Sequence, residues 1–346
     1  MKGSLPSVLE EVPHVPQVWA DRGVPLAVAL AGCGAPATAP SGGSGNTDVA
    51  TGGRLFSTAD EATARLGADV GPGVFPRTVT HARGQTRLEA KPQRVVVLDT
   101  GELDDVLSLG VTPVGFASPN GEIPSYLEPR VAGVTNIGSL DGLRLEAVAA
   151  LQPDLILGSQ LRVDELYDQL SAIAPTVLEI RPGFPWKENL LLVGAALGEE
   201  ERATTLLNDY QRKADELRAG LPQTPTISLL RFMPERIRLY GNLSFIGVIL
   251  QDVGLPRPQV QDIDELAAEI SQERISEADG DWLFYSSYGP PEATAEGAVV
   301  GGELWGRLGA VQRGTARPVN DEVWFLGLGP AGADIVLDDL RQFLGG

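Results

Sequence analysis

The sequence predicts an α/β protein built from two Rossmann-like lobes that one long helix joins. From about residue 76 onward, short apolar runs typical of buried strands alternate with amphipathic helix patterns. Such alternation predicts mainly parallel sheets with helices on both faces. Over residues 186–220 the alternation stops, because two helix patterns follow one another, and it then resumes. This interruption divides the pattern into two lobes.

The first half starts with a β-hairpin, because RTVTHARGQTRLEAK alternates polar and apolar residues around a glycine. A buried strand over residues 95–98 follows. TGELDDVLSLG then predicts a helix, with apolar residues at helical spacing, acids in its first turn and Gly110 after its end. The later strand patterns are VTPVGF, VTNIG, DLILGS and TVLEI, and the helix patterns between them are LEAVAAL and VDELYDQL.

The second half begins after the helix pattern WKENLLLVGAAL and a longer one in EEERATTLLNDYQRKADELRAG, whose acids lie early and whose basic residues lie late, as the helix dipole favours. Strand patterns in TISLLRFM, RIRLYG, DWLFYSS and VWFLG then alternate with helix patterns in SFIGVILQDVG, ELWGRLGA and DIVLDDLRQFL. We therefore expect a leader over 1–32, a flexible tether over 33–74, a first lobe over 75–198, a linking helix over 199–221 and a second lobe over 222–346.

Composition excludes several classes of function. A net charge of -19 argues against nucleic-acid binding, which needs a basic surface. One cysteine and two histidines exclude an internal disulfide and argue against a metal or haem site made by the protein itself. The nucleophile elbow, phosphate loop, zinc-protease and dinucleotide motifs are missing. The acidic pairs Asp104-Asp105 and Asp338-Asp339 are typical of solvated helix faces. We expect no enzyme activity and no cofactor.

Candidate ligand-binding residues follow the predicted strands, because ligands of open α/β sheets bind beyond the carboxyl ends of the strands. Arginines there favour a ligand with oxyanions, and aromatic side chains favour a rigid one. The alternative is that the arginines form surface ion pairs and that Trp324 belongs to the core. The candidates are Arg162, Arg181, Arg231, Tyr240, Tyr288 and Trp324.

The two predicted lobes also share a short internal repeat. Glu146 precedes Asp154 by eight residues, and Glu273 precedes Asp281 by the same offset. In both places a short helix pattern leads to a buried strand. A glutamate at such a position is also explained by its preference for a helix N-terminus.

From about Phe75 to its end, the chain resembles the substrate-binding lipoproteins of iron(III)-siderophore and vitamin B12 ABC importers. It is most similar to the siderophore and ferric-citrate type of high-GC Gram-positive bacteria, the actinobacteria. The resemblance is carried, in order, by KPQRVVVLDTGELDDVLSLGVTPVG, LEAVAALQPDLILGS, LYDQLSAIAPTV, RFMPERIRLYGNLSFIG, ISQERISEADGDWLFYSSYG and VWFLGLGP.

This resemblance implies two lobes bridged by a rather rigid helix, with a ligand cleft between them and only small opening motions. It implies ligand contacts from Arg162, Arg231 and Trp324. It also implies that Glu146 and Glu273 dock into basic pockets of the membrane permease.

The segment Leu30-Ala31-Gly32-Cys33 resembles a lipobox, which implies that a lipid is attached to Cys33 and that the chain is cut before it. Two acyl chains anchor a protein stably, and the polar segment after Cys33 serves as a tether. The preceding residues are unusual for a leader, since they hold three acids and several prolines. We expect a monomer outside the cytoplasm, anchored to the outer face of the cytoplasmic membrane.

Together these features predict a protein that captures an iron(III)-siderophore complex and delivers it to an ABC permease, with the iron held by the chelator. Alternatives within the class are binding of haem, cobalamin or ferric citrate. Two alternatives from other classes are an extracytoplasmic hydrolase with a carboxylate pair across the cleft and a scaffold without a ligand.

Overall fold

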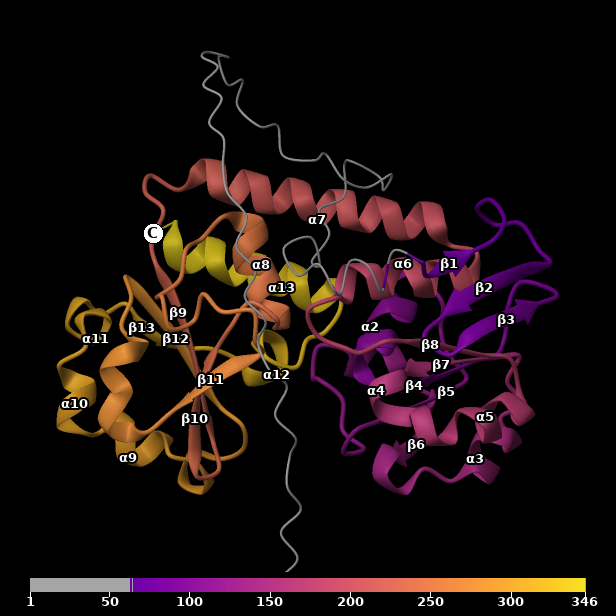
Figure 1. Cartoon of the computed structure of the whole chain (residues 1–346), viewed down its shortest axis with the longest axis horizontal. Helices are drawn as coiled ribbons and strands as arrows, with labels where there is room; N and C mark the ends of the chain where they lie inside the picture. Colours follow the sequence, from indigo (N-terminus) through magenta and orange to yellow (C-terminus); the bar gives the residue numbers. More distant parts are fainter. Residues whose placement is uncertain (1–62, 64, 346) are drawn as a thin grey trace, which may run out of the picture. The chain divides into compact units, whose positions relative to one another are not determined.

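The first large sheet is entirely parallel, in the strand order β6-β5-β4-β7-β8 (Figure 1). The computed structural model describes residue 63 and residues 65–345, which lie within one compact unit of the chain. Strands buried on both faces read as continuous apolar runs, which explains the sequence VVVL in the central strand. The strands are β4 (Val95–Leu98), β5 (Gly115–Ser118), β6 (Thr135–Ser139), β7 (Leu155–Ser159) and β8 (Thr176–Glu179).

Short helices surround this sheet, and a small antiparallel sheet lies beside β8. The small sheet contains the predicted hairpin, and its strands are β1 (Gly67–Ala68), β2 (Arg77–His81) and β3 (Gly84–Leu88). The helices are α2 (Thr100–Ser108), α3 (Leu145–Ala150), α4 (Gln160–Val163), α5 (Tyr167–Ile173) and α6 (Trp186–Leu197), with 3-10 turns η1 (Glu128–Val131), η2 (Leu140–Gly142) and η3 (Asp164–Leu166).

The second large sheet is mixed, in the order β11-β10-β9-β12-β13. Strands β9, β12 and β13 are parallel, while β10 and β11 are antiparallel additions at one edge. The strands are β9 (Ile227–Met233), β10 (Arg236–Tyr240), β11 (Ala267–Ile270), β12 (Trp282–Ser287) and β13 (Ala316–Pro318). The helices are α8 (Phe245–Val253), α9 (Glu296–Val300), α10 (Glu303–Gly306), α11 (Gly309–Arg313), α12 (Asp321–Trp324) and α13 (Pro330–Leu344), with turns η4 (Gln272–Ala278) and η5 (Pro291–Ala293).

Two details of this sheet differ from the sequence prediction. The pattern VWFLG is not a strand, because Asn320 caps a helix there by accepting hydrogen bonds from the backbone of Glu322 and Val323. The edge position belongs instead to β13, whose short polar sequence gave no strand signal. Strand β11 was also missed, since the short edge sequence AAEI lacks a periodic apolar pattern.

Helix α7 (Glu200–Gly220) connects the two large sheets in sequence and packs against α6, α8 and α13 (Figure 1). At its start, Glu200 pairs with the fully buried guanidinium of Arg77. Further along, Lys213 pairs with Asp334 of α13 at 2.7 Å. The long helix is therefore attached to elements of both lobes.

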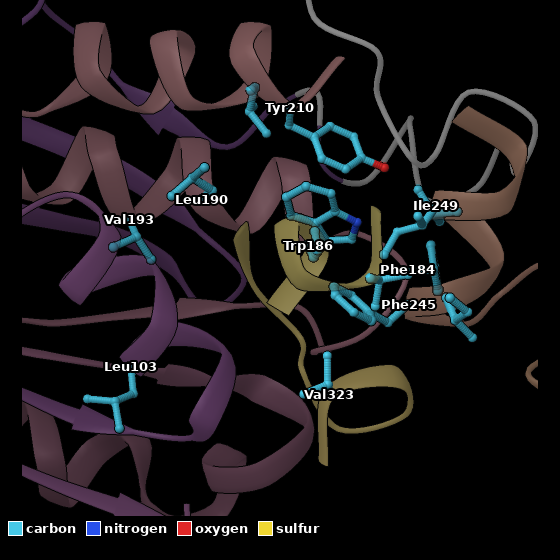
Figure 2. Close-up of a cluster of buried hydrophobic side chains, with 14 of the residues drawn as sticks. Leu103, Phe184, Trp186, Leu190, Val193, Tyr210, Phe245, Ile249 and Val323 are labelled. Atoms are coloured by element: carbon cyan, nitrogen blue, oxygen red, sulfur yellow. The ribbon is translucent and has the colours of Figure 1, made fainter. Parts of the chain in front are cut away.

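An aromatic core lies where the helices of the two lobes meet (Figure 2). Trp186 of α6 packs edge-on against Tyr210 of α7, with ring centroids 4.9 Å apart, and against Phe245 of α8 at 5.9 Å. Ile249 and Val323 extend the same cluster. Aromatic side chains of this size supply much of the free energy of burial in a core. The two lobes consequently share one hydrophobic core instead of touching only through a linker.

A buried ion pair lies within this core. The ammonium of Lys187 on α6 donates to Oδ2 of Asp252 on α8 at 2.7 Å, and the hydroxyl of Tyr210 donates to the same oxygen at 2.9 Å. The side chains of Lys187 and Asp252 are only 1% and 8% exposed. One carboxylate thus joins helices of the first lobe, the linking helix and the second lobe.

Asp104 makes a second connection between the lobes. This residue on α2 is fully buried and accepts hydrogen bonds from the backbone of Ala331 and Gly332, in the first turn of α13, at 3.1 Å each. The hydroxyl of Tyr126 lies 3.1 Å from Asp104 and donates to the carbonyl of Gly327. A carboxylate at a helix N-terminus is favoured by the free backbone N–H groups and by the helix dipole.

This contact corrects the prediction that Asp104 and Asp105 lie on a solvated helix face. Both are buried, because α2 is covered by α6 on one side and by α13 on another. Asp338 of the other acidic pair is exposed as expected, whereas Asp339 accepts a hydrogen bond from a core tryptophan.

We predict that Lys187→Ala lowers the free energy of unfolding by about 3–5 kcal/mol, because it leaves the carboxylate of Asp252 buried without its cation. Lys213→Ala is the matched control: it removes a lysine from a half-exposed pair and should cost less than about 1 kcal/mol. Urea denaturation of both variants measures the difference. Equal losses of stability would contradict a special role for the buried pair.

Candidate functional site

Arg162 lies at the carboxyl end of the first sheet. It belongs to α4, directly after β7, and its Nε donates to Oδ2 of Asp99 at 3.1 Å. Asp99 is fully buried at the end of β4, where its other oxygen accepts the backbone N–H of Thr100 at 2.7 Å and caps α2. The terminal nitrogens of Arg162 have no hydrogen-bond partner among residues 65–345, and the side chain is 38% exposed. Asp99 therefore holds the arginine by its inner nitrogen while the outer N–H groups stay available.

Arg181 follows the neighbouring strand β8 and lies close to Arg162. Its guanidinium packs over the ring of Phe184, 5.1 Å from the centroid, and makes only a long contact of 3.5 Å with the carbonyl of Pro182. Partial burial lowers the pKa of Arg181, and the positive charge of Arg162 lowers it further. The structure thus brings the two predicted arginines of this lobe together.

Leu161 was not predicted from the sequence. It precedes Arg162 in the first turn of α4, and 61% of its surface is exposed. A large apolar side chain this exposed beside two arginines offers contact to an apolar part of a ligand. No sequence signal marked it, because the apolar residues of a short helix ordinarily face the core.

A cluster of buried acids lies behind these arginines. Glu102 and Asp105 belong to α2 and Glu179 ends β8; all three are at most 2% exposed, and their carboxyl oxygens have no hydrogen-bond partner within residues 65–345. Burial raises the pKa of each well above its usual value, and the negative charges of neighbouring acids raise it further. The cluster therefore favours protonated, uncharged carboxyl groups, which do not cancel the charge of the arginines.

Arg231 occupies a different environment in the second lobe. It lies near the end of β9 and is only 5% exposed. Its Nε donates to Oδ1 of Asp321 at 2.7 Å and its Nη2 pairs with Oδ2 of the same residue. Its Nη1 lies 3.2 Å from the hydroxyl of Tyr240. This two-point contact neutralises most of the charge of Arg231 and leaves two of its five N–H groups unassigned.

Aromatic rings enclose the same guanidinium. Arg231 lies 4.6 Å from the ring centroid of Tyr288 and 5.4 Å from that of Phe325. Ser286 of β12 donates to Asp321 at 2.6 Å and fixes the carboxylate from the other side. Tyr288 is 44% exposed, whereas Tyr240 is buried. Tyr288 is thus the most accessible of the predicted residues in this lobe.

Trp324 was expected to contact the ligand, but the structure places it in the core. Its side chain is fully buried, it packs on Phe284 at 4.8 Å, and its indole N–H donates to Asp339 at 2.8 Å. The expectation rested on a strand that is in fact α12, so the side chain points inward. With its only polar group satisfied, Trp324 presents no surface to a ligand.

The two repeated glutamates are exposed at corresponding positions. Glu146 lies in the first turn of α3 and Glu273 in the first turn of η4. In each repeat the following aspartate accepts hydrogen bonds from the backbone just before a strand. Asp154 accepts from the N–H groups of residues 93 and 94, and Asp281 accepts from that of Thr226. Hydrogen bonding to Ser271 lowers the pKa of Glu273, which keeps it charged. Cys33 lies outside the described residues.

Other surfaces offer weaker candidates. A surface depression beside the end of α7, lined by residues that include Leu221, Pro225 and Trp282, contains none of the predicted ligand residues. Within the described chain, no three His, Cys, Asp or Glu side chains are grouped to hold a metal ion. None of the described helices is both long and apolar enough to cross a membrane.

Comparison with known proteins agrees with the two-lobed α/β fold. The family model for periplasmic binding proteins matches residues 95–316. A probable siderophore-binding lipoprotein of Bacillus subtilis (strain 168) is 34% identical over 283 residues, covering 77% of this chain and 87% of the relative. The achromobactin-binding periplasmic protein of Dickeya dadantii (strain 3937) is 31% identical, covering 73% and 87%.

Two solved structures have a similar fold. Staphylococcus aureus SirA complexed with staphyloferrin B is similar with a TM-score of 0.69 and 29% identity, covering 77% of this chain and 98% of that protein. The siderophore periplasmic binding protein from the fuscachelin gene cluster of Thermobifida fusca gives a TM-score of 0.62 and 27% identity, covering 74% and 98%.

The acid cluster predicts a dependence of stability on pH. Because the folded-state pKa values of Glu102 and Glu179 are raised, the folded chain binds more protons than the unfolded chain until the pH exceeds those values. Stability should therefore fall as the pH rises above the ordinary glutamate pKa of 4.5 toward the raised folded-state values, by up to about 1.4 kcal/mol per pH unit for each carboxyl that stays protonated. His81 acts in the opposite direction between about pH 4 and 6.5, since burial lowers its pKa from 6.5 to about 4.

Urea denaturation across this pH range provides the measurement. Glu102→Gln together with Glu179→Gln should flatten the slope, whereas Glu89→Gln, which changes an exposed carboxyl, should leave it unchanged. A slope that is the same in all three proteins would show that the buried acids are ionised in the folded chain.

Proposed function

The chain belongs to the periplasmic binding protein family, and on that premise we propose that it captures an iron(III)-siderophore complex and delivers it to an ABC permease. The observation that carries the proposal is the pair Arg162 and Arg181, whose outer N–H groups lack partners among the described residues at the carboxyl ends of adjacent strands. Planar guanidinium groups bind carboxylate, catecholate and hydroxamate oxygens through charge-assisted hydrogen bonds. Leu161 and Tyr288 add apolar contacts, one from each lobe.

Two features favour a chelate over the alternatives. His81 is buried and hydrogen-bonded near Thr86, so it offers no axial nitrogen to haem iron. The acid cluster of Glu102, Asp105 and Glu179 is too deeply buried to act on a substrate, which disfavours the hydrolase. In our proposal the protein makes and breaks no covalent bond, and the chelator supplies every iron ligand.

We further propose that the protein works outside the cytoplasm as a monomer, anchored to the outer face of the cytoplasmic membrane through lipid on Cys33. The lipobox-like residues before Cys33 support the anchor, as does the description of the Bacillus relative as a lipoprotein. The polar segment after Cys33 then separates the lobes from the membrane surface.

The function is tested by a thermal-shift screen of the purified protein with ferric hydroxamates, ferric catecholates, ferric citrate, haem and cobalamin. Binding to the folded state raises the melting temperature by mass action. We expect a shift with at least one ferric siderophore and none with haem or cobalamin. A shift with haem or cobalamin alone would replace the proposed ligand.

We predict that Arg162→Ala and Arg181→Ala each weaken binding of the identified chelate by about tenfold to a hundredfold, the value of one or two charge-assisted hydrogen bonds. Quenching of tryptophan fluorescence during titration gives the affinities. Arg212→Ala, which removes an exposed arginine from α7, is the control. Unchanged affinity in both site variants would remove these arginines from the binding site. Arg231→Ala is a poorer test, because it would leave the carboxylate of Asp321 without its ion-pair partner.

We predict that Glu146→Ala combined with Glu273→Ala abolishes uptake of the chelate by cells while leaving its affinity for the purified protein unchanged. The reason is that both glutamates are exposed at corresponding positions of the two lobes, where a permease can reach them. Radiolabelled iron uptake and fluorescence titration are the two measurements, and Glu165→Ala with Glu292→Ala is a control of equal charge change. Normal uptake by the double variant would refute the docking role.

A further inference from the structure

The charge of the candidate site is smaller than its three arginines indicate. Arg162 shares an ion pair with the buried Asp99, and Arg231 shares a two-point ion pair with Asp321. Arg181 pairs with no carboxylate among the described residues. Three guanidinium groups and two carboxylates leave one positive charge. This charge balance could not be predicted from the sequence, because Asp99 and Asp321 are distant along the chain from the arginines that they neutralise.

A further acid of the second lobe lies on the other face of the sheet from Arg231 and does not enter this sum. Glu296 of α9 accepts a hydrogen bond from Ser287, which precedes Tyr288 at the end of β12. Ser287 alternates along β12 with Ser286, and Ser286 is the residue that bonds Asp321 beside Arg231. The buried acids Glu102, Asp105 and Glu179 are not counted, because burial raises the pKa of each carboxyl group well above its usual value.

Resting on the proposed function, we infer that the site selects ferric chelates of low charge, neutral or singly negative, and discriminates against triply negative tris-catecholate complexes. A trianion would need positive charge that Asp99 and Asp321 already neutralise. A neutral trihydroxamate complex loses no binding free energy through this charge neutralisation. It still gains hydrogen bonds from the free N–H groups and contacts with Leu161 and Tyr288.

Asp321 is accordingly a residue that sets specificity through charge and also positions Arg231. Its carboxylate accepts from Nε and Nη2 of Arg231 and from Ser286, which fills three of its roughly four acceptor positions. Removing its charge while keeping its shape gives Arg231 a full positive charge. Such a change affects a trianion strongly and a neutral complex little.

The test compares the affinities of ferrichrome, a neutral trihydroxamate complex, and ferric enterobactin, a trianionic tris-catecholate complex. For the wild type we expect tighter binding of ferrichrome. Asp321→Asn should shift the ratio of the two dissociation constants by about tenfold toward ferric enterobactin, and added salt should reduce this shift. Asp321→Glu, which keeps the charge, should retain the wild-type ratio.

Glu216→Gln is the matched control, because it removes one carboxylate that faces an arginine on the exposed surface of α7. Asp99→Asn provides the same readout in the first lobe if the Asp321 variant does not fold. Tighter binding of ferric enterobactin by the wild type, or equal ratios in the aspartate variants and in Glu216→Gln, would overturn the inference. If no ferric chelate in the thermal-shift screen bound at all, the proposed function itself would fail.

Discussion

The carboxylate of Asp252 joins the parts of this molecule on which the candidate site depends. It receives hydrogen bonds from Lys187 on a helix of the first lobe and from Tyr210 on the linking helix, while it belongs itself to a helix of the second lobe. Trp186 packs across the same junction against Tyr210 and Phe245 (Figure 2). Because a buried ion pair tolerates little separation of its partners, these contacts fix the distance between the lobes. Asp104 at the start of α13 adds a second fixed point.

A fixed junction has a consequence for binding. Arg162 and Arg181 on one lobe and Tyr288 on the other are held by elements whose relative positions the junction sets. A preorganised site avoids much of the entropic cost of ordering side chains and lobes around a ligand. The ion pairs with Asp99 and Asp321 extend this order to the guanidinium groups themselves, so that selectivity depends on charge and on fixed hydrogen-bond directions.

The sequence predicted the features that depend on local patterns. The buried strand at residues 95–98 and the long helix α7 were identified because apolar periodicity and charge order are local properties. The pattern VWFLG gave a wrong prediction of a strand, because helix capping by the side chain of Asn320 outweighed the strand propensity of these residues. That single difference moved Trp324 from the candidate site into the core.

The partners of the arginines lay beyond any local pattern. Asp99 precedes Arg162 by 63 residues and Asp321 follows Arg231 by 90, so only the folded chain shows that each arginine is paired. Burial of Asp104 and of the acid cluster could likewise not be predicted from the sequence, since it arises from helices that pack around α2. Residue type suggested the candidate site residues, while their charge balance is a property of tertiary structure.

A crystal structure of the protein with a bound ferric siderophore tests the central claim most directly. The account predicts the chelate between the lobes, with its oxygens within hydrogen-bond distance of Arg162 and Arg181, with Leu161 and Tyr288 against its apolar parts, and with the Lys187–Asp252 pair intact. A chelate bound elsewhere, or lobes that separate so that this ion pair breaks, would contradict it.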